Sequence, residues 1–459
     1  MDLMDKIFRE YDIRGIYGTD LNEKTVKAIG KAVGEYFVKK GVKTISIGFD
    51  ARLSAENIFN WLVSGLNLSN VEIYNIGLLP TPVGYFSVFT EEFDANIMIT
   101  GSHNPKEYNG FKITIGKDSL YGKELAEVGK KAIEYTKTDI EDNLKFKKYD
   151  ILTKYLEFYN EAFKGLKGFK EPFIIDCGNG TAGITTAKIC ENLELNAKIL
   201  FKEPDGNFPN HHPDPSEAKN LEHLKAKMKQ TGINLGFAFD GDSDRIAVLT
   251  PKRSIKGDEL ACLFSLNMKN PKILGEVKCS QVMYDFINSH GGEAIMCKTG
   301  HSNIKKAIKE LNADLGAEVS GHIYFKERFF GFDDAVYAMF RVLELVKLGY
   351  DLDAEIEKLP VMYSTDEIKI QTSDEKKFQI VEKLKQKLKD ENFVDGLGKI
   401  VEICDIDGIR VKFENGWALV RASNTTPVIV TRFEAKTDEF KDKLQEKFIK
   451  LVDDIKLSL

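Results

Sequence analysis

Short apolar runs alternate along most of the chain with longer segments whose apolar residues recur at helical spacing. The same order, a strand, a helical segment and a second strand, occurs at 44–76, 172–201 and 272–297. This alternation predicts parallel α/β units, which bind ligands at the loops following their strands. In the first copy the pattern predicts a strand at 44–49, and in the third it predicts a strand at 272–274, a helix at 281–289 and a strand at 293–297.

The C-terminal part of the chain has a different pattern. Two amphipathic segments, 378–388 and 438–455, predict helices, and strands at 417–420 and 428–434 flank a polar loop. The lysines of these helices are typical of solvated faces. We therefore predict a smaller α+β unit at this end of the chain.

The length of 459 residues suggests about three domains, and the pattern divides the chain further. We place boundaries near Tyr149, Thr250 and Pro360. The expected domains are three similar α/β domains and a C-terminal α+β domain, at 1–149, 150–250, 251–360 and 361–459.

The composition is that of a folded protein. The chain is 42% hydrophobic and 30% charged, with a net charge of −6, which excludes a disordered chain and a general nucleic-acid footprint. No apolar run approaches the roughly 18 residues of a membrane span, and residues 1–10 lack the apolar core of a signal peptide. We expect a cytoplasmic protein without nucleic-acid or membrane partners, whose six cysteines are reduced.

An acidic loop follows the apolar run 235–239. Asp240, Asp242 and Asp244 alternate with Gly241 and Ser243, and the glycine allows the carboxylates to converge. Carboxylate oxygens are ligands that suit Mg²⁺. The alternative is an acidic surface turn, but three acids behind a buried strand would repel one another without a cation.

A second loop, 100–105, follows the apolar run 95–99 and contains Ser102 and His103. The serine is a candidate nucleophile. A Ser-His catalytic pair is weakly supported, because adjacent side chains rarely point the same way. A polar turn without chemistry is the alternative.

Two later loops could recognise a sugar phosphate. Glu318 and Ser320 alternate, so in extended backbone they would face the same way. A lone histidine such as His322 is more often structural than catalytic. Arg421 begins a segment, 421–427, of hydroxyl and amide residues between two strands. This segment predicts an anion-binding nest, with a simple hairpin loop as the alternative.

Residues 178–183 fit the G-x-G-x-x-G pattern of dinucleotide-binding folds, after a strand and before a helix. A dehydrogenase is therefore an alternative at the level of patterns. It gives no role to the three aspartates of the acidic loop.

Together the four loops resemble those of the α-D-phosphohexomutase superfamily, most closely its bacterial phosphomannomutase/phosphoglucomutase branch. The similarity covers the family's phosphoserine, metal, sugar and phosphate loops, at 100–105, 240–245, 317–322 (with Ala317 in place of a glycine) and 421–427. It extends to 8–15, 109–112, 277–279, 299–301 and 325–334, and thus to almost the whole chain.

The resemblance implies three α/β domains with mixed sheets and a C-terminal α+β domain around a central cleft. It implies that Ser102 is phosphorylated and that Mg²⁺ lies between this phosphate and Asp240, Asp242 and Asp244. The implied catalytic residues are Ser102, Lys112, Arg245 and His301, and of these Lys112 and His301 are favoured for handling the hydroxyl proton. The implied substrate-binding residues are Tyr11, Arg14, Lys278, His301, Glu318, Ser320, His322, Arg421, Ser423, Asn424 and Thr425.

The implied reaction moves a phosphoryl group between O1 and O6 of mannose or glucose phosphates. Its intermediate and activator is a hexose 1,6-bisphosphate, which must turn over in the site. A phosphoglucosamine mutase, a Mg²⁺-dependent sugar phosphatase and a non-catalytic sugar-phosphate sensor are alternatives, although Ser102 and the three aspartates speak against a sensor. Val319 stands where the glucosamine branch usually has glutamine, which favours mannose or glucose. We expect a monomer acting on small sugar phosphates.

Overall fold

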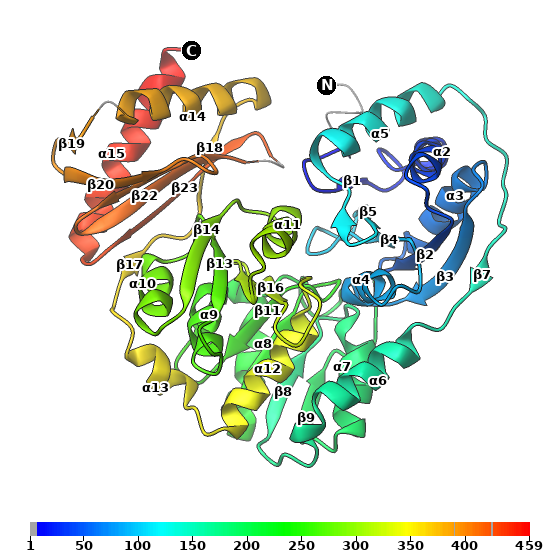
Figure 1. Ribbon diagram of the computed structural model, residues 1–459, viewed down its shortest axis with the longest axis horizontal. Coiled ribbons are helices and arrows are strands. Elements are labelled where there is room, and N and C mark those ends of the chain that lie inside the picture. Colours follow the sequence, from blue (N-terminus) through cyan, green and yellow to red (C-terminus); the bar gives the residue numbers. More distant parts are fainter. Residues whose placement is uncertain (1–6, 390, 424–425) are drawn as a thin grey trace.

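The computed structural model describes residues 7–389, 391–423 and 426–459. Its strands form four sheets in chain order, each at the centre of one domain. Figure 1 shows the domains in an arc, with the first domain (blue to cyan) and the fourth (orange to red) at its two ends. The second and third domains, green to yellow, join them.

The first domain has a seven-stranded sheet in the order β1-β5-β4-β2-β3-β7, with β6 beside β5. Its strands β2, β3 and β4 are parallel, and β5 runs antiparallel to β4 and to β1. The strands are β1 Ile13–Ile16, β2 Thr44–Phe49, β3 Glu72–Leu78, β4 Ala95–Ile99, β5 Tyr108–Ile115, β6 Asp118–Ser119 and β7 Lys147–Lys148. The helices are α2 Glu23–Lys39, α3 Ala55–Leu66, α4 Thr81–Phe89 and α5 Gly122–Tyr135.

The second domain repeats this mixed arrangement in the order β12-β11-β10-β8-β9, with β8, β9 and β10 parallel. Its strands are β8 Phe173–Asp176, β9 Ala197–Leu200, β10 Gly236–Phe239, β11 Ile246–Leu249 and β12 Ser254–Ile255. Its helical segments are α6 Leu152–Ala162, η1 Lys164–Leu166, α7 Ala182–Asn192, η2 Ala218–Leu221 and α8 Glu222–Thr231.

The third domain has the order β14-β13-β15-β16, with β16 antiparallel to β15. One hydrophobic core runs through the second and third domains and takes in α4 and parts of β3 and β4 of the first domain. The strands are β13 Lys272–Glu276, β14 Glu293–Cys297, β15 Leu315–Ala317 and β16 Ile323–Phe325. The helices are α9 Gly257–Ser265, α10 Gln281–Ser289, α11 His301–Leu311, α12 Ala335–Lys347 and α13 Leu352–Glu357.

The fourth domain is an antiparallel sheet packed against two helices, α14 Asp374–Lys389 and α15 Asp438–Leu457. Its strands are β17 Tyr363–Ser364, β18 Ile368–Gln371, β19 Phe393–Val394, β20 Gly398–Cys404, β21 Ile409–Phe413, β22 Gly416–Ala422 and β23 Val428–Ala435. Strand β22 is buried throughout. One face packs in the core of the fourth domain, and the other meets the third domain, where Trp417 and Leu419 pack on Val277. The Arg410 guanidinium stacks 3.8 Å from the Trp417 ring and donates to the Val277 and Cys279 carbonyls.

Several predicted elements agree with the structure. Strands β2, β4 and β14 and helix α10 have the predicted bounds, and the fold class of three mixed α/β domains and an α+β domain is confirmed. All six cysteines are free, as expected. Within the described residues, no helix combines the length and the apolar character that crossing a bilayer requires.

A buried carboxylate joins the second and third domains. Asp334 caps α12 by accepting a hydrogen bond from the Tyr337 N–H, and it accepts 2.7 Å hydrogen bonds from the Tyr155 and Tyr159 hydroxyls of α6. Burial outweighs these hydrogen bonds and raises the pKa of Asp334 from 3.8 to about 6. The folded protein therefore holds this proton more tightly than the unfolded chain does.

We expect this stabilisation to be complete below about pH 4 and to be lost as the pH rises through about 6, a change of about 3 kcal/mol. An Asp334→Asn variant does not titrate, so its free energy of unfolding should fall less over this window. Urea unfolding between pH 4 and 7 measures the difference. Asp351→Asn, at the exposed N-cap of α13, is the matched control. Equal pH slopes in the wild type and Asp334→Asn would contradict the prediction.

Candidate active site

The loop between β10 and β11 brings the three predicted aspartates together. Asp240, Asp242 and Asp244 are fully buried, and each offers an oxygen within 4.8 Å of those of the others. Asp240 Oδ1 accepts hydrogen bonds of 3.1 Å from two N–H groups of its own loop, which closes the turn. Among the described residues, Asp242 Oδ1 and Asp244 Oδ1 have no hydrogen-bond partner despite their burial.

The protein balances the negative charge of this loop only in part. Lys112, on β5, places Nζ 2.7 Å from Asp242 Oδ2 and 2.5 Å from Asp244 Oδ2. Against the effect of burial, these contacts lower the pKa of Asp242 and raise that of Lys112. Burial and the other two aspartates raise the pKa of Asp240 well above its ordinary value. Free oxygens and excess negative charge fit a hard divalent cation such as Mg²⁺.

A neighbouring group, Asp244, His322 and Asp333, could also hold a cation by spacing alone. Among the described residues, His322 Nδ1 and both Asp333 oxygens have no hydrogen-bond partner, and the other contacts of the group give it a second role. His322 Nε2 accepts from Arg245 Nε at 2.9 Å, so a neutral ring carries its proton on Nδ1, 3.1 Å from Asp333 Oδ2. Asp333 in turn lies 3.3 Å from Lys305 Nζ. This group orients Arg245 beside the aspartates.

The Ser102 loop meets the acidic loop from the first domain. Ser102 is buried, has a left-handed backbone (φ 48°), and places Oγ 3.1 Å from Asp240 Oδ2. Its Oγ also lies 3.1 Å from His103 Nδ1. The expectation that these neighbouring side chains point apart is wrong, because the left-handed turn at Ser102 brings them to one side. Burial and Arg245 lower the pKa of His103 well below its ordinary value.

The backbone of this loop is held by Arg52, which follows β2. Its guanidinium donates to the carbonyls of residues 102, 104, 105 and 108 at 2.5–2.8 Å. Asp50 Oδ2 accepts from Arg52 Nε, the Thr100 hydroxyl and the Gly101 N–H. A Cβ at Gly101 would lie 2.1 Å from Arg52 Cζ, so only glycine allows this approach.

Two further contacts tie the loops of the first and second domains together. His212 Nε2 donates to the His103 carbonyl at 2.6 Å, and Thr81 Oγ1 donates to Asp242 Oδ2 at 2.6 Å. The glycine-rich turn at 178–183, which fits the dinucleotide-binding pattern, also supports the acidic loop. A Cβ at Gly180 would lie 2.7 Å from the Gly241 carbonyl, so this turn is glycine-rich because the acidic loop packs on it.

Two predicted residues, Tyr11 of the first domain and His301 of the third, meet at α11, on the inner side of the arc (Figure 1). His301, which is partly buried, begins this helix, and its ring lies 6.0 Å from Tyr11 and 6.4 Å from His322 between centroids. The Tyr11 hydroxyl donates to the Thr299 carbonyl at 2.9 Å. Burial, followed by the charge of Lys305, lowers the pKa of His301 well below its ordinary value.

Arg14 and Lys278 are buried cations near these groups. Arg14 donates to the Thr100 carbonyl and pairs with Asp12, each at 2.5 Å. Lys278 Nζ lies 2.6 Å from Glu367 of the fourth domain and 3.8 Å from Glu276.

The sugar loop differs from the expectation of extended backbone. Residues 318–321 form a turn, in which the Gly321 N–H donates to the Glu318 carbonyl at 3.0 Å. Glu318 and Ser320 therefore do not face one way by strand alternation. Gly321 has φ 93°, and a Cβ there would lie 2.3 Å from the Ile246 carbonyl, so this glycine makes the turn possible. Glu318 is buried and accepts a 2.6 Å hydrogen bond from the Tyr324 hydroxyl.

The predicted phosphate loop joins β22 to β23. Arg421 is buried, and its Nε donates to Asp407 Oδ2 at 3.0 Å. The Ser423 and Thr426 hydroxyls lie 2.8 Å apart, and the Ser423 N–H donates to the Val428 carbonyl. Asn424 and Thr425, predicted to bind phosphate, lie outside the described residues.

Four family models match consecutive parts of the chain. They are the three alpha/beta/alpha domains of phosphoglucomutase/phosphomannomutase, I at 5–139, II at 153–253 and III at 256–363, and its C-terminal domain at 367–451. The chain belongs to the phosphoglucomutase/phosphomannomutase family. The dehydrogenase alternative is thereby excluded.

Individual relatives agree with this family along the whole chain. A "Phosphomannomutase/phosphoglucomutase" of Pseudomonas syringae pv. tomato is 41% identical, over 97% of this chain and 95% of its own. A "Phosphoglucomutase" of Neisseria gonorrhoeae is 39% identical, over 96% and 95%. The crystal structure of a phosphoglucomutase/phosphomannomutase family protein from Burkholderia thailandensis is 34% identical, with a TM-score of 0.88 over 99% of this chain and 98% of its own.

Some residues that shape this phosphohexomutase site have no local sequence signal of their own. These residues are Arg52, Lys305 and Asp333. Each depends on contacts with other segments of the chain, which periodicity does not predict. The one available hint was position, because Arg52 follows a buried strand at the end where ligands bind.

We expect an Arg52→Lys variant to lower the kcat of the mutase on the order of 100-fold, because lysine keeps the charge but loses several charge-assisted hydrogen bonds. Steady-state assays with a circular dichroism check of folding measure the effect. Arg328→Lys, at an exposed arginine, is the matched control. An Arg52→Lys variant with the kcat of the wild type would show that the loop holds its own shape.

Proposed function

We propose that this family member is a phosphohexomutase that interconverts the 1-phosphates and 6-phosphates of mannose, glucose or both, with Ser102 as the residue that carries the transferring phosphoryl group. The observation that supports this role is the position of Ser102 Oγ, 3.1 Å from Asp240 in a buried cluster of three aspartates. The left-handed backbone of Ser102 supports it further, because such strain is typical of functional turns.

Asp240, Asp242 and Asp244 would hold Mg²⁺ next to the Ser102 phosphate. When bound, the ion would neutralise the charge of the transferring group. Arg245, fixed by His322 at 2.9 Å, would add positive charge from the same side. Lys112 would do so from β5, since its raised pKa keeps it protonated.

The hydroxyl that receives the phosphoryl group must lose a proton. Of the two residues favoured from the sequence, we assign this step to His301, because its lowered pKa leaves the ring neutral, with one nitrogen that can accept a proton. In the same proposal Lys112 stays charged and does not act as a base.

The hexose 1,6-bisphosphate intermediate and activator must turn over between the two transfers. We propose that Arg421, Ser423, Asn424 and Thr425 bind the phosphate that is not reacting, in both orientations. The sugar would contact residues of the other domains, namely Tyr11, Arg14, Lys278, Glu318, Ser320 and His322. The enzyme would act in the cytoplasm as a monomer, on small sugar phosphates alone.

We expect Ser102→Ala to abolish isomerisation, because alanine cannot carry the phosphoryl group. A coupled assay would follow glucose 6-phosphate from glucose 1-phosphate, with Mg²⁺ and a trace of glucose 1,6-bisphosphate. Mannose 1-phosphate and glucosamine 1-phosphate would run in parallel. Ser289→Ala, at an exposed serine of α10, is the matched control.

The outcomes separate the alternatives. Turnover of glucose or mannose phosphate that Ser102→Ala lacks and Ser289→Ala keeps supports the proposal. Activity on glucosamine phosphate alone would indicate a phosphoglucosamine mutase. Free phosphate without any isomer would overturn the mutase and indicate a phosphatase.

We expect Asp240→Asn to abolish the rise in melting temperature that Mg²⁺ gives the wild type, without lowering that of the metal-free protein. The asparagine keeps the hydrogen bonds of Oδ1 and removes one of three mutually repelling charges. Thermal unfolding in EDTA and in excess Mg²⁺ tests this; at 100 times its Kd, the ion adds about 2.7 kcal/mol. Asp453→Asn, exposed on α15, is the control. A full Mg²⁺ effect in Asp240→Asn would argue against this metal site.

A further inference from the structure

Asp407 lies in the turn between β20 and β21, where it faces Arg421, the arginine that we propose to bind phosphate. Its Oδ2 accepts from Arg421 Nε at 3.0 Å and its Oδ1 from Arg421 Nη2 at 3.3 Å. Both side chains are largely buried, with 13% of Asp407 and 7% of Arg421 exposed. A buried pair with two hydrogen bonds fixes the plane of the guanidinium.

The same carboxylate reaches the third domain. Asp407 Oδ2 also accepts a 3.0 Å hydrogen bond from the Thr299 N–H. Thr299 is tied on its other sides, because its carbonyl accepts from Tyr11 and its hydroxyl donates to Glu276. One carboxylate thus links the fourth domain to the segment that precedes His301.

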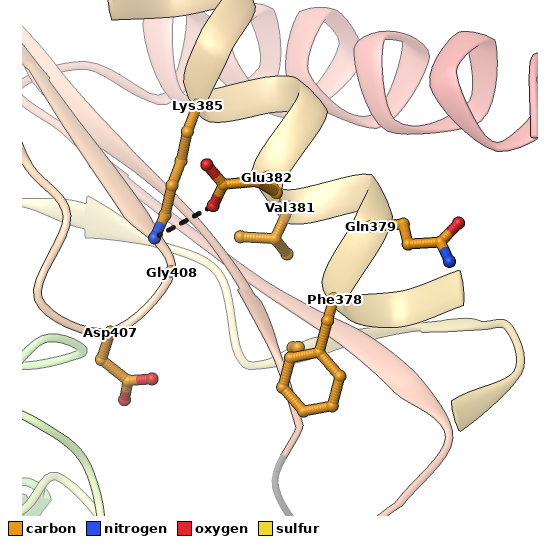
Figure 2. A pocket seen from close by; sticks show the side chains of 8 residues that line it. Phe378, Gln379, Val381, Glu382, Lys385, Asp407 and Gly408 are labelled. Atoms are coloured by element: carbon orange, nitrogen blue, oxygen red, sulfur yellow. Dashed lines mark ion pairs between the residues drawn. The ribbon is translucent and has the colours of Figure 1, made fainter. Parts of the chain in front are cut away.

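The turn that contains Asp407 packs against Arg421. Gly408 has φ 81°, and a Cβ there would lie 2.5 Å from Arg421 Cβ, so the turn packs directly on the arginine. On its other side, the turn lines a hollow of about 420 Å³ against α14 (Figure 2). There Lys385 pairs with Glu382, while the Asp407 carboxylate points away from the helix (Figure 2).

We propose that Asp407 is a positioning residue, which orients Arg421 for a substrate phosphate and couples it to the Thr299 loop. Asp407 occupies the Nε–Nη2 edge of the guanidinium, and the Nη1–Nη2 edge is the second edge that can bind a phosphate with two hydrogen bonds. This inference rests on the proposed function of Arg421.

The test is an Asp407→Asn variant assayed beside the wild type. An asparagine must turn an N–H group toward donors of Arg421 or Thr299, so the arginine loses its fixed orientation. We expect KM for glucose 1-phosphate or mannose 1-phosphate to rise about tenfold, with a much smaller change in kcat. Asp405→Asn is the matched control, because Asp405 lies in the same turn and pairs with Lys389 away from the site.

A double-mutant cycle with Arg421→Ala separates positioning from a structural role. If Asp407 acts through Arg421, adding Asp407→Asn to Arg421→Ala should change KM no further. Additive effects would overturn the inference, as would an unchanged KM in the single variant. A lower KM would also overturn it, since Asp407 would then compete with phosphate for Arg421. If the wild type itself isomerises no sugar phosphate, the proposed function fails and this inference fails with it.

Discussion

The concentration of negative charge beside Ser102 is the constraint on which the rest of the site depends. Of three fully buried carboxylates, Asp240 contacts the Ser102 hydroxyl, and a phosphoryl group at Ser102 would add a charge of about −1.5 to −2. The nearest compensating charge, Lys112, comes from another strand and another domain. Arg245 is aimed by His322 and Asp333 of the third domain. Residues of three domains therefore surround the acidic loop and set its charge balance.

Some contacts that hold the two reacting loops come from the loop's own domain, as those of Arg52 do, and others cross a domain boundary, as that of His212 does. Each loop is short and follows a buried strand, so few of its own residues can satisfy its backbone groups. The carbonyls of 102–105 receive hydrogen bonds from Arg52 and His212. The close approach of Gly180 to Gly241 fixes the acidic loop from behind. Precise placement of Ser102 Oγ is thus a property of the packed domains.

The hydrophobic pattern and the short motifs predicted those elements whose structure depends on residues close in sequence. The apolar runs gave β2, β4, β14 and helix α10 their bounds, because burial and periodicity act within each segment. The acidic loop was predicted because its charges are adjacent in sequence. The turn at 318–321 was missed, since its shape depends on Gly321 packing against the Ile246 carbonyl. Arg52 and Asp407 were not predicted as site residues, because their partners are distant in sequence.

A substrate that must turn over in the site requires one part of the protein to stay fixed. The chain of contacts from Arg421 through Asp407 and Thr299 to Tyr11 joins the fourth, third and first domains. In the proposed mechanism Arg421 holds one phosphate while the other reacts at Ser102, so the distance between these groups must match the length of the hexose. A mobile arginine would hold the phosphate at many distances, and most of them would be unproductive. Two hydrogen bonds from the guanidinium to a buried carboxylate reduce that freedom before the substrate arrives, which lowers the entropic cost of binding.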